Sequence, residues 1–284
     1  WLAFPFVLVL CTVLYGVVPG PVVKGYAQDE VGRSLWYQLN GLTCFALVLL
    51  SLFLFPWALP YVTFPPLHCL VANVWNGVFL GFGLGSLFSL ILFFAGPLGK
   101  CAPKREASVT EYIEGRASIM AKLEHFFFGF RLNPRAGGFD FKMYLYLFGA
   151  VMLAVNVLGA LALEMEQTGQ ISSASSTYAL LMGWFLVDYL YHEEIHLYTY
   201  DLVDENVGWK LAFGCFCFYP YAYAVPLLPF TLITPDIAIE PMSRELILIS
   251  VVIFFAGWGL SRGANNQKYY FKRNPKAEFF LFGL

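Results

Sequence analysis

The sequence predicts an all-α, polytopic membrane protein with about seven transmembrane helices. Of its 284 residues, 59% are hydrophobic and only 13% are charged, and the mean hydropathy is +0.65. A soluble domain of this size could not bury so much apolar surface away from water. Apolar stretches of about 20 residues, the length that crosses ~30 Å of hydrocarbon, also recur along the whole chain. We therefore expect lipid to surround most of it.

The predicted spans follow these apolar stretches in order. No Asp, Glu, Lys or Arg occurs from Ser34 to Gly99, a distance too long for one crossing. The prolines at positions 60, 65 and 66 divide it into two. Each stretch is long enough to cross with some allowance for tilt. The seven predicted spans are 1–23, 41–63, 68–97, 143–163, 174–191, 210–234 and 245–261.

The distribution of positive charge predicts the orientation. In a seven-span chain, the segments on one side hold 16 of the 17 Lys and Arg residues, and the opposite side keeps only Arg244. Cytoplasmic loops carry an excess of Lys and Arg, so we expect the first side to be cytoplasmic. Its segments are 24–40, the long loop 99–142, 192–210 and the tail from 262.

We expect residues 1–284 to form a single transmembrane domain, because no repeat or linker marks a second one. The domain is expected to be incomplete, since the chain begins at Trp1 inside an apolar stretch and without the charged region of a signal peptide. A net charge of −2 and the lack of a basic tract argue against a nucleic-acid partner. The six cysteines lie mostly in apolar stretches, where thiols pack as small hydrophobes, and they do not identify the compartment.

Asp188 lies inside the fifth predicted span. An ionised carboxylate at the centre of a membrane helix costs ~2.5–3.5 kcal/mol on insertion scales, and residues kept there are usually functional. Alternatively, Asp188 lies near the cytoplasmic end of the span, contacts Tyr191 or His192, and only fixes helix packing. Both interpretations remain open.

The sixth predicted span contains Pro220, Pro226 and Pro229, which remove backbone hydrogen bonds at membrane depth. Broken helices occur there where they line a cavity or are buried in protein. Tyr219 and Tyr223 are one helical turn apart and would place two hydroxyl groups on one face. Either hydroxyl could donate a proton, or both could simply pack and form hydrogen bonds.

Residues 192–196 read His-Glu-Glu-Ile-His and match the H-E-x-x-H pattern of zinc metalloproteases. In such a site His192 and His196 would bind Zn²⁺, and Glu193 would act as the general base. The next carboxylates follow His196 too closely for the usual third zinc ligand. A membrane zinc protease is therefore the least favoured interpretation.

A cluster of cations follows the last predicted span. These residues could bind the phosphates of a nucleotide or anionic lipid headgroups. They could also serve only to hold this end of the helix on the cytoplasmic side. The cations are Arg262, Lys268, Lys272 and Arg273.

Four ordered blocks resemble one known family. Residues 24–41 end in Leu-Asn-Gly, and residues 127–142 contain Phe-Phe-Gly-Phe-Arg-Leu-Asn-Pro-Arg followed by Gly-Phe-Asp-Phe-Lys. Residues 188–223 contain Glu193-Glu194, Thr199 with Asp201, and Ala-Phe-Gly, and residues 262–271 read Arg-Gly-Ala-Asn-x-Gln-Lys-x-x-Phe. Together they are similar to the sterol reductases, which include the sterol C14-reductases, the membrane region of lamin B receptor, the C24(28)-reductases and 7-dehydrocholesterol reductase.

The resemblance implies a ten-helix enzyme of the endoplasmic reticulum membrane, or of the inner nuclear membrane, that transfers hydride from NADPH to a sterol double bond. Reducing an isolated alkene needs an acid for one carbon and a hydride donor for the other. By position, Tyr223 would be the acid or part of its relay, oriented by Asp188 or Glu194. The residues that would bind NADPH are Arg262, Asn265, Lys268, Lys272 and Arg273.

The chain also departs from the family pattern. Residues 145–149 read Leu-Tyr-Leu-Phe-Gly in place of the family's Glu-Leu-Arg-Pro-Gly, Cys215 replaces an Asp, and Pro226 stands where Gln is common. The family's last helices, with Gly-Trp-Trp-Gly and Arg-His-x-Asn-Tyr blocks, are expected beyond residue 284. Lys272 replaces an Arg, which keeps the charge but loses the planar fork of donors.

Two functions therefore stay open: a reductase, with the C14 double bond preferred, or a reductase-derived membrane subunit that binds sterol or a membrane-complex partner without catalysis. The partners expected of the first are a sterol and membrane lipid.

Overall fold

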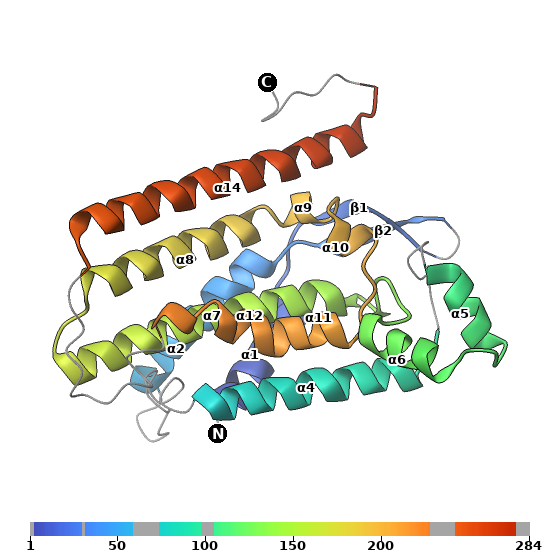
Figure 1. Ribbon diagram of the computed structural model, residues 1–284, viewed down its shortest axis with the longest axis horizontal. Coiled ribbons are helices and arrows are strands. Elements are labelled where there is room, and N and C mark those ends of the chain that lie inside the picture. Colours follow the sequence, from blue (N-terminus) through green and yellow to red (C-terminus); the bar gives the residue numbers. More distant parts are fainter. Residues whose placement is uncertain (1–2, 30–31, 59–73, 98–104, 228–241, 277–284) are drawn as a thin grey trace.

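The computed structural model describes residues 3–29, 32–58, 74–97, 105–227 and 242–276, and it is mostly helical (Figure 1). Six helices of at least 15 residues form the body of the protein. They are α1 (Ala3–Val17), α2 (Gly41–Ala58), α4 (Val74–Phe94), α7 (Phe141–Thr168), α8 (Ser173–Tyr191) and α14 (Arg244–Arg273).

Short elements connect or interrupt these helices. The short helical elements are α5 (Glu106–Ile113), α6 (Ile119–Phe128), α9 (Glu193–His196), α10 (Tyr200–Val203), α11 (Trp209–Phe213), η2 (Gly214–Phe218), α12 (Tyr219–Ala222) and η3 (Val225–Leu227). The strands are β1 (Val22–Gln28), β2 (Ser34–Gln38), β3 (Arg135–Ala136) and β4 (Phe139–Asp140), which form two antiparallel pairs.

The prediction of an all-α fold needs one correction, because the segment 24–40 is not a plain loop. Strands β1 and β2 form a hairpin in which Val22 pairs with Gln38 and Lys24 pairs with Trp36. The valines and aromatic residues in this segment favour strands. Gly32, in the turn, has φ +82°, a conformation that glycine adopts most readily.

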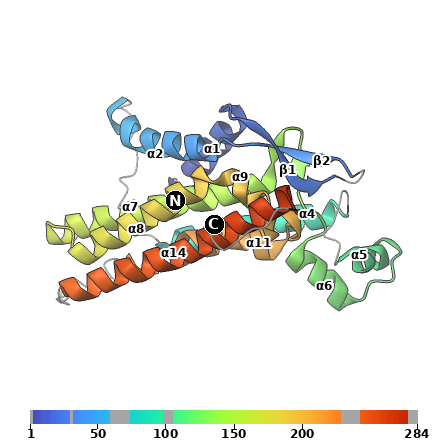
Figure 2. The same ribbon diagram turned by 90° about the horizontal axis from the view of Figure 1, so that it is seen from above.

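Helix α7 lies at the centre of the helical body and is buried on most of its surface. It contacts α1, α2, α8 and α12, and α14 lies on the outer side of α8 (Figure 2). The α7 side chains that are almost fully buried include Leu145, Phe148, Val151 and Val155. A membrane helix that is apolar on all faces is expected to occupy the interior of a bundle.

The break predicted near Pro220 is present. The segment from Trp209 to Leu227 is divided into an α turn, a π turn, a second α turn and a 3₁₀ turn. The carbonyl of Pro220 accepts a hydrogen bond from the side chain of Asn156 on α7, at 2.9 Å. A backbone group freed by the break is thus satisfied from the neighbouring helix, as burial in an apolar interior requires.

Helix α4 approaches this broken segment through a row of glycines. At Gly81, an added Cβ would lie 2.3 Å from the carbonyl oxygen of Phe216, so only glycine allows the two backbones to come so close. Small residues spaced four apart are typical of helix contacts in membranes. The row consists of Gly77, Gly81 and Gly85.

Among the residues that the structure describes, three helices are long and apolar enough to cross a bilayer: α4, α7 and α14. Two shorter apolar helices cover residues 4–17 and 41–54. The structure thus supports several membrane crossings, while the number seven remains a prediction. Parts of the predicted spans 41–63, 68–97 and 210–234, with the prolines that divide the second apolar stretch, lie outside the described residues.

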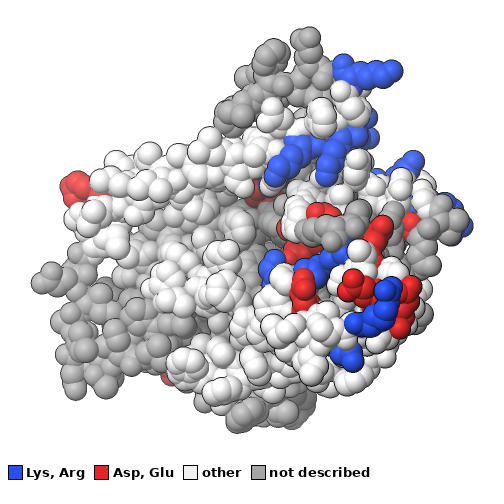
Figure 3. Space-filling model, turned by 45° about the vertical axis from the view of Figure 1, so that its right-hand side comes forward, with Lys and Arg blue, Asp and Glu red and all other residues white. Residues whose placement is uncertain are grey.

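The described parts of the four segments predicted to be cytoplasmic lie at one end of the molecule, where the hairpin, α5, α6, α9 and the end of α14 gather (Figure 1). Lys and Arg side chains are concentrated over this end, and much of the remaining visible surface is uncharged (Figure 3). The tail after residue 262 is not a loop, because α14 continues to Arg273. This arrangement agrees with the charge pattern along the sequence.

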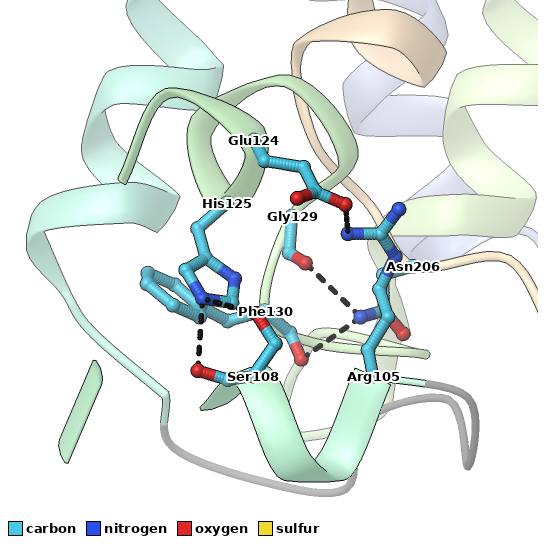
Figure 4. A network of polar contacts seen from close by, with 7 residues as sticks. All are labelled: Arg105, Ser108, Glu124, His125, Gly129, Phe130 and Asn206. Atoms are coloured by element: carbon cyan, nitrogen blue, oxygen red, sulfur yellow. Dashed lines mark hydrogen bonds and ion pairs between the residues drawn. The ribbon is translucent and has the colours of Figure 1, made fainter. Parts of the chain in front are cut away.

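A buried polar network holds the two helices of segment 99–142 together (Figure 4). The ring of His125 is fully buried, stacks on Phe130 at 4.7 Å, and its Nε2 lies 3.1 Å from the carbonyl oxygen of Ser108. Asn206 donates to the carbonyls of Gly129 and Phe130. The network therefore joins α5 and α6 to the segment that precedes α11.

His125 predicts a pH dependence of this region. Its Nδ1 has no partner among the described residues, and burial lowers the pKa of the ring. The unfolded segment, with an ordinary pKa of about 6.5, then binds more protons than the folded one. Its stability is full above about pH 6.5 and is lost as the pH falls below that value.

Proteolysis of α5 should therefore be several-fold faster at pH 5.5 than at pH 7.5. The variant His125→Gln, which cannot titrate, should show little change between the two conditions. Cleavage of the unmodified protein at one rate at both pH values would contradict this role of His125.

Candidate functional site

The carboxylate of Asp188 is compensated by charge from the last helix. Asp188 lies one turn before the end of α8, and its carboxylate binds the guanidinium of Arg262 on α14. His192 Nδ1 lies 3.2 Å from the other carboxylate oxygen. Both Asp188 and Arg262 are almost buried, with side chains 11% and 12% exposed. A charge in a membrane span is tolerated when it is paired in this way.

The pairing leaves several polar atoms of α14 unsatisfied. Nε and Nη1 of Arg262 are buried and have no partner among the described residues. The same holds for Nε1 of Trp258 and Oδ1 of Asn266. These residues are spaced four apart and therefore share one face of α14. Buried polar atoms are usually satisfied, so these unpaired atoms make this face a candidate for contact with a further polar group.

Two turns further along α14, the same face reaches Glu194 on α9. Tyr269 donates to Glu194 Oε1 at 2.7 Å, and Arg273 Nη1 lies 3.0 Å from the same oxygen. Arg273 also lies over the ring of Tyr269. Helix α14 thus brings Arg262 and Arg273, two predicted cofactor-binding residues, to the two predicted catalytic carboxylates.

Lys272 connects α14 to the hairpin. Its Nζ donates to the carbonyl of Tyr198 at 2.7 Å and lies 4.7 Å from the centre of the Tyr26 ring.

Lys268 is exposed on the same part of α14. Burial raises the pKa of Asp201, and the nearby positive charges of Lys142, Lys210 and Lys268 oppose this shift. Asn265 is half-buried on α14.

An open groove of about 800 Å³ lies between the hairpin and the end of α14. This volume falls within the range of ligand-binding clefts. Three cationic side chains line it against one carboxylate, so its electrostatic character favours an anion. The charged and aromatic lining residues include Lys24, Tyr26, Trp36, Glu194, Lys272 and Arg273.

Tyr219 and Tyr223 lie away from this groove, beside α8. Their rings meet edge to face at 5.3 Å, and Tyr223 also stacks on Phe185 at 6.5 Å. Tyr223 is 47% exposed, whereas the hydroxyl of Tyr219 is buried without a partner among the described residues. No hydrogen bond within the described part joins Tyr223 to Asp188 or Glu194; one oxygen of each carboxylate instead binds a residue of α14.

The H-E-x-x-H residues have other roles in this structure. Helix α8 ends at Tyr191, so the two histidines do not share one regular helix. Glu193 accepts a hydrogen bond from the backbone N–H of Gly41 at 3.0 Å, and burial raises its pKa to about 7. Burial, assisted by the charge of Arg262, lowers the pKa of His196 to about 4. No metal-binding cluster of three such residues occurs in the described part.

The comparisons with known proteins can be set against this geometry. The sequence profile of the ergosterol biosynthesis ERG4/ERG24 family matches residues 1–281. The chain belongs to this family. The resemblance to sterol reductases predicted from the four blocks is thereby confirmed.

Several relatives are named Delta(14)-sterol reductase. The protein from Methylotuvimicrobium alcaliphilum is 29% identical over 90% of this chain and 55% of its own length. The Arabidopsis thaliana protein is 26% identical over 95% of this chain and 68% of its length. The Mus musculus protein, Delta(14)-sterol reductase TM7SF2, is 30% identical over 92% of this chain and 58% of its length. The chain thus spans between half and about two thirds of these ERG4/ERG24 relatives.

The block 127–142, by which the sequence most resembles the family, builds the scaffold of the charged end. The side chain of Lys142 is fully buried and donates to the carbonyls of Asp201 and Glu205. Arg135 pairs with Asp140 at 2.7 Å. These contacts fix the segment 192–210 of this ERG4/ERG24 protein, from which Glu194 and Tyr198 reach the groove.

Sequence reasoning missed several residues of the site. Trp258, Asn266 and Tyr269 were not selected, although they share the Arg262 face at spacings of three and four. Tyr26 and Trp36 were not selected either, because the segment was expected to be a loop. The valines and aromatic residues of this segment, which favour strands, would have been the signal for them.

Proposed function

We propose that this chain is the major part of an NADPH-dependent sterol reductase that acts on the C14 double bond. The single observation that carries the proposal is the seam between α8, α9 and α14, where cationic side chains meet two carboxylates beside a groove of about 800 Å³. Relatives named Delta(14)-sterol reductase, matching at least 90% of the chain, support the reaction and the choice of double bond.

The residues of the seam fit the cofactor. Lys268, Lys272 and Arg273 would bind its phosphates, because ammonium and guanidinium groups form strong charge-assisted hydrogen bonds with phosphate. Arg262 and Asn266 carry the N–H donors and the acceptor that a carboxamide needs, but these atoms are buried, so binding a carboxamide there would require the side chains to move. When bound, NADPH supplies the hydride.

The protein must also supply a proton to the alkene. Tyr223 is the proposed donor: its ring is fixed by Tyr219 and Phe185, and its exposed edge is accessible to an apolar ligand. Asp188 and Arg262 act one turn further along α8, where they fix the distance between α8 and α14. The apolar surroundings would exclude water and strengthen a proton transfer from a neutral phenol.

Sterol and membrane lipid are the proposed partners, and a membrane of the endoplasmic reticulum or the inner nuclear membrane is the proposed location. The relatives include a Gallus gallus protein named Delta(14)-sterol reductase LBR, 29% identical over 92% of this chain. The proposed orientation places the groove in the cytosol, where NADPH is available.

A test of the cofactor site is Lys268→Ala in the full-length protein. We expect the KM for NADPH to rise about tenfold, as for the loss of one charge-assisted contact worth ~1.5–3 kcal/mol. The control is Lys122→Ala, which removes an exposed lysine from α6 at the same end of the molecule. A KM that is the same in both variants and in the unmodified enzyme would assign the cations to lipid headgroups instead.

A further inference from the structure

One face of the β1–β2 hairpin carries exposed aromatic and cationic side chains. Residues alternate along β1: Lys24 and Tyr26 are exposed, whereas Gly25 and Ala27, which follow each of them, are buried. Trp36 on β2 is the cross-strand partner of Lys24 and therefore lies on the same face. Trp36 is 60% exposed and Tyr26 is 45% exposed, and both line the groove.

The hairpin is held in place from behind. The carbonyl of Trp36 accepts a hydrogen bond from Arg135 Nη1 at 2.8 Å, and Arg135 is itself paired with Asp140. Arg135 also lies 4.4 Å from the centre of the buried Tyr37 ring. An added Cβ at Gly25 would lie 2.4 Å from that ring, so the two strands of the hairpin are in close contact at this point. Arg135 and the Tyr37 ring thus support the hairpin on the side opposite the exposed face.

The opposite wall of the groove is cationic. Lys272 lies over the ring of Tyr26, and Arg273 is the next residue of α14. A ligand between the two walls would contact the aromatic rings of the hairpin on one side. It would contact cations on both sides: Lys24 on the hairpin, and Lys272 and Arg273 on α14. Aromatic rings bind nucleobases by stacking, and cations bind phosphates. A nucleotide carries both groups.

We propose that this hairpin face binds the adenosine 2′-phosphate end of the dinucleotide, with Trp36 stacking on the adenine and Lys24 contacting phosphate. The inference rests on the proposed function and adds a binding surface between the first two helices, far in sequence from α14. It makes the groove two-sided: α14 provides one wall and the hairpin the other.

The experiment measures the affinity of the full-length protein in nanodiscs by calorimetry. The probes are NADP⁺ and adenosine 2′,5′-bisphosphate, which carries only the adenosine end. Trp36→Ala should weaken binding of the bisphosphate about fivefold or more, the scale of losing one stacked base. Trp36→Phe keeps a ring and should recover most of the affinity. Lys24→Ala should weaken both probes.

A matched control is Trp75→Ala on α4, because Trp75 is also 60% exposed but does not line the groove. Its affinities should equal those of the unmodified protein. Unchanged bisphosphate affinity in Trp36→Ala and Lys24→Ala would overturn the hairpin assignment while the proposed function stands. Binding of neither probe to the unmodified protein would instead overturn the proposed function.

Discussion

Replacing Tyr223 by Phe is expected to lower sterol turnover about 100-fold, the usual scale for the loss of a general acid. The substitution removes only a hydroxyl group. The ring contacts with Tyr219 and Phe185 remain, so the fold and sterol binding should persist. Turnover of a Δ14 sterol with NADPH, and sterol binding measured separately, would distinguish loss of chemistry from loss of substrate.

Tyr219→Phe is the matched control for this prediction. The hydroxyl of Tyr219 is buried without a described partner, so its removal should leave stability unchanged or slightly raised. Turnover should stay within about threefold of the unmodified enzyme if Tyr223 is the donor. The reverse pattern would move the proton donor to Tyr219. Full activity in both variants would remove tyrosine from the proposed chemistry.

Breaking the ion pair between Asp188 and Arg262 should have the largest effect on stability. Asp188→Leu leaves a guanidinium without its counter-ion in a nearly buried site. Removing one member of a buried pair typically costs about 3–5 kcal/mol. The free energy of unfolding, measured by titration of the detergent-solubilised protein with SDS, should fall by that amount.

A double-mutant cycle separates the pair from its surroundings. Arg262→Met alone should also destabilise the protein, whereas Asp188→Leu with Arg262→Met should be less destabilised than either single variant, because no charge is left unpaired. Additive losses in the double variant would show that the two side chains do not stabilise one another.

The sequence predicted the membrane class and most helix positions, because both depend on local properties. The predicted span 174–191 agrees with α8 (Ser173–Tyr191), and the predicted break in the sixth span is present at Pro220. The predicted ends of helices were less accurate where a helix continues into polar residues. The tail after 262 was expected to leave the helix, yet α14 continues for three more turns because its face contacts Glu194 and Tyr198.

Contacts between distant segments could not be read from the sequence. Asp188 and Arg262 were both selected, but for separate roles. They are 74 positions apart, and nothing in a single sequence shows that two such distant residues form an ion pair. A lone carboxylate in a span did require some cation as its partner. The role of Glu193 could not be predicted either, because its contact with Gly41 lies 152 positions away.

Helix α14 has a mechanical consequence for the groove. Its 30 residues extend about 45 Å, some 15 Å more than the hydrocarbon layer of a typical bilayer. The apolar half and the cation-bearing half therefore belong to one continuous helix. A change of bilayer thickness that tilts the apolar half is therefore expected to shift Lys272 and Arg273 relative to the hairpin. Through the tilt of α14, membrane composition is thus expected to change the affinity of the groove for an anionic ligand.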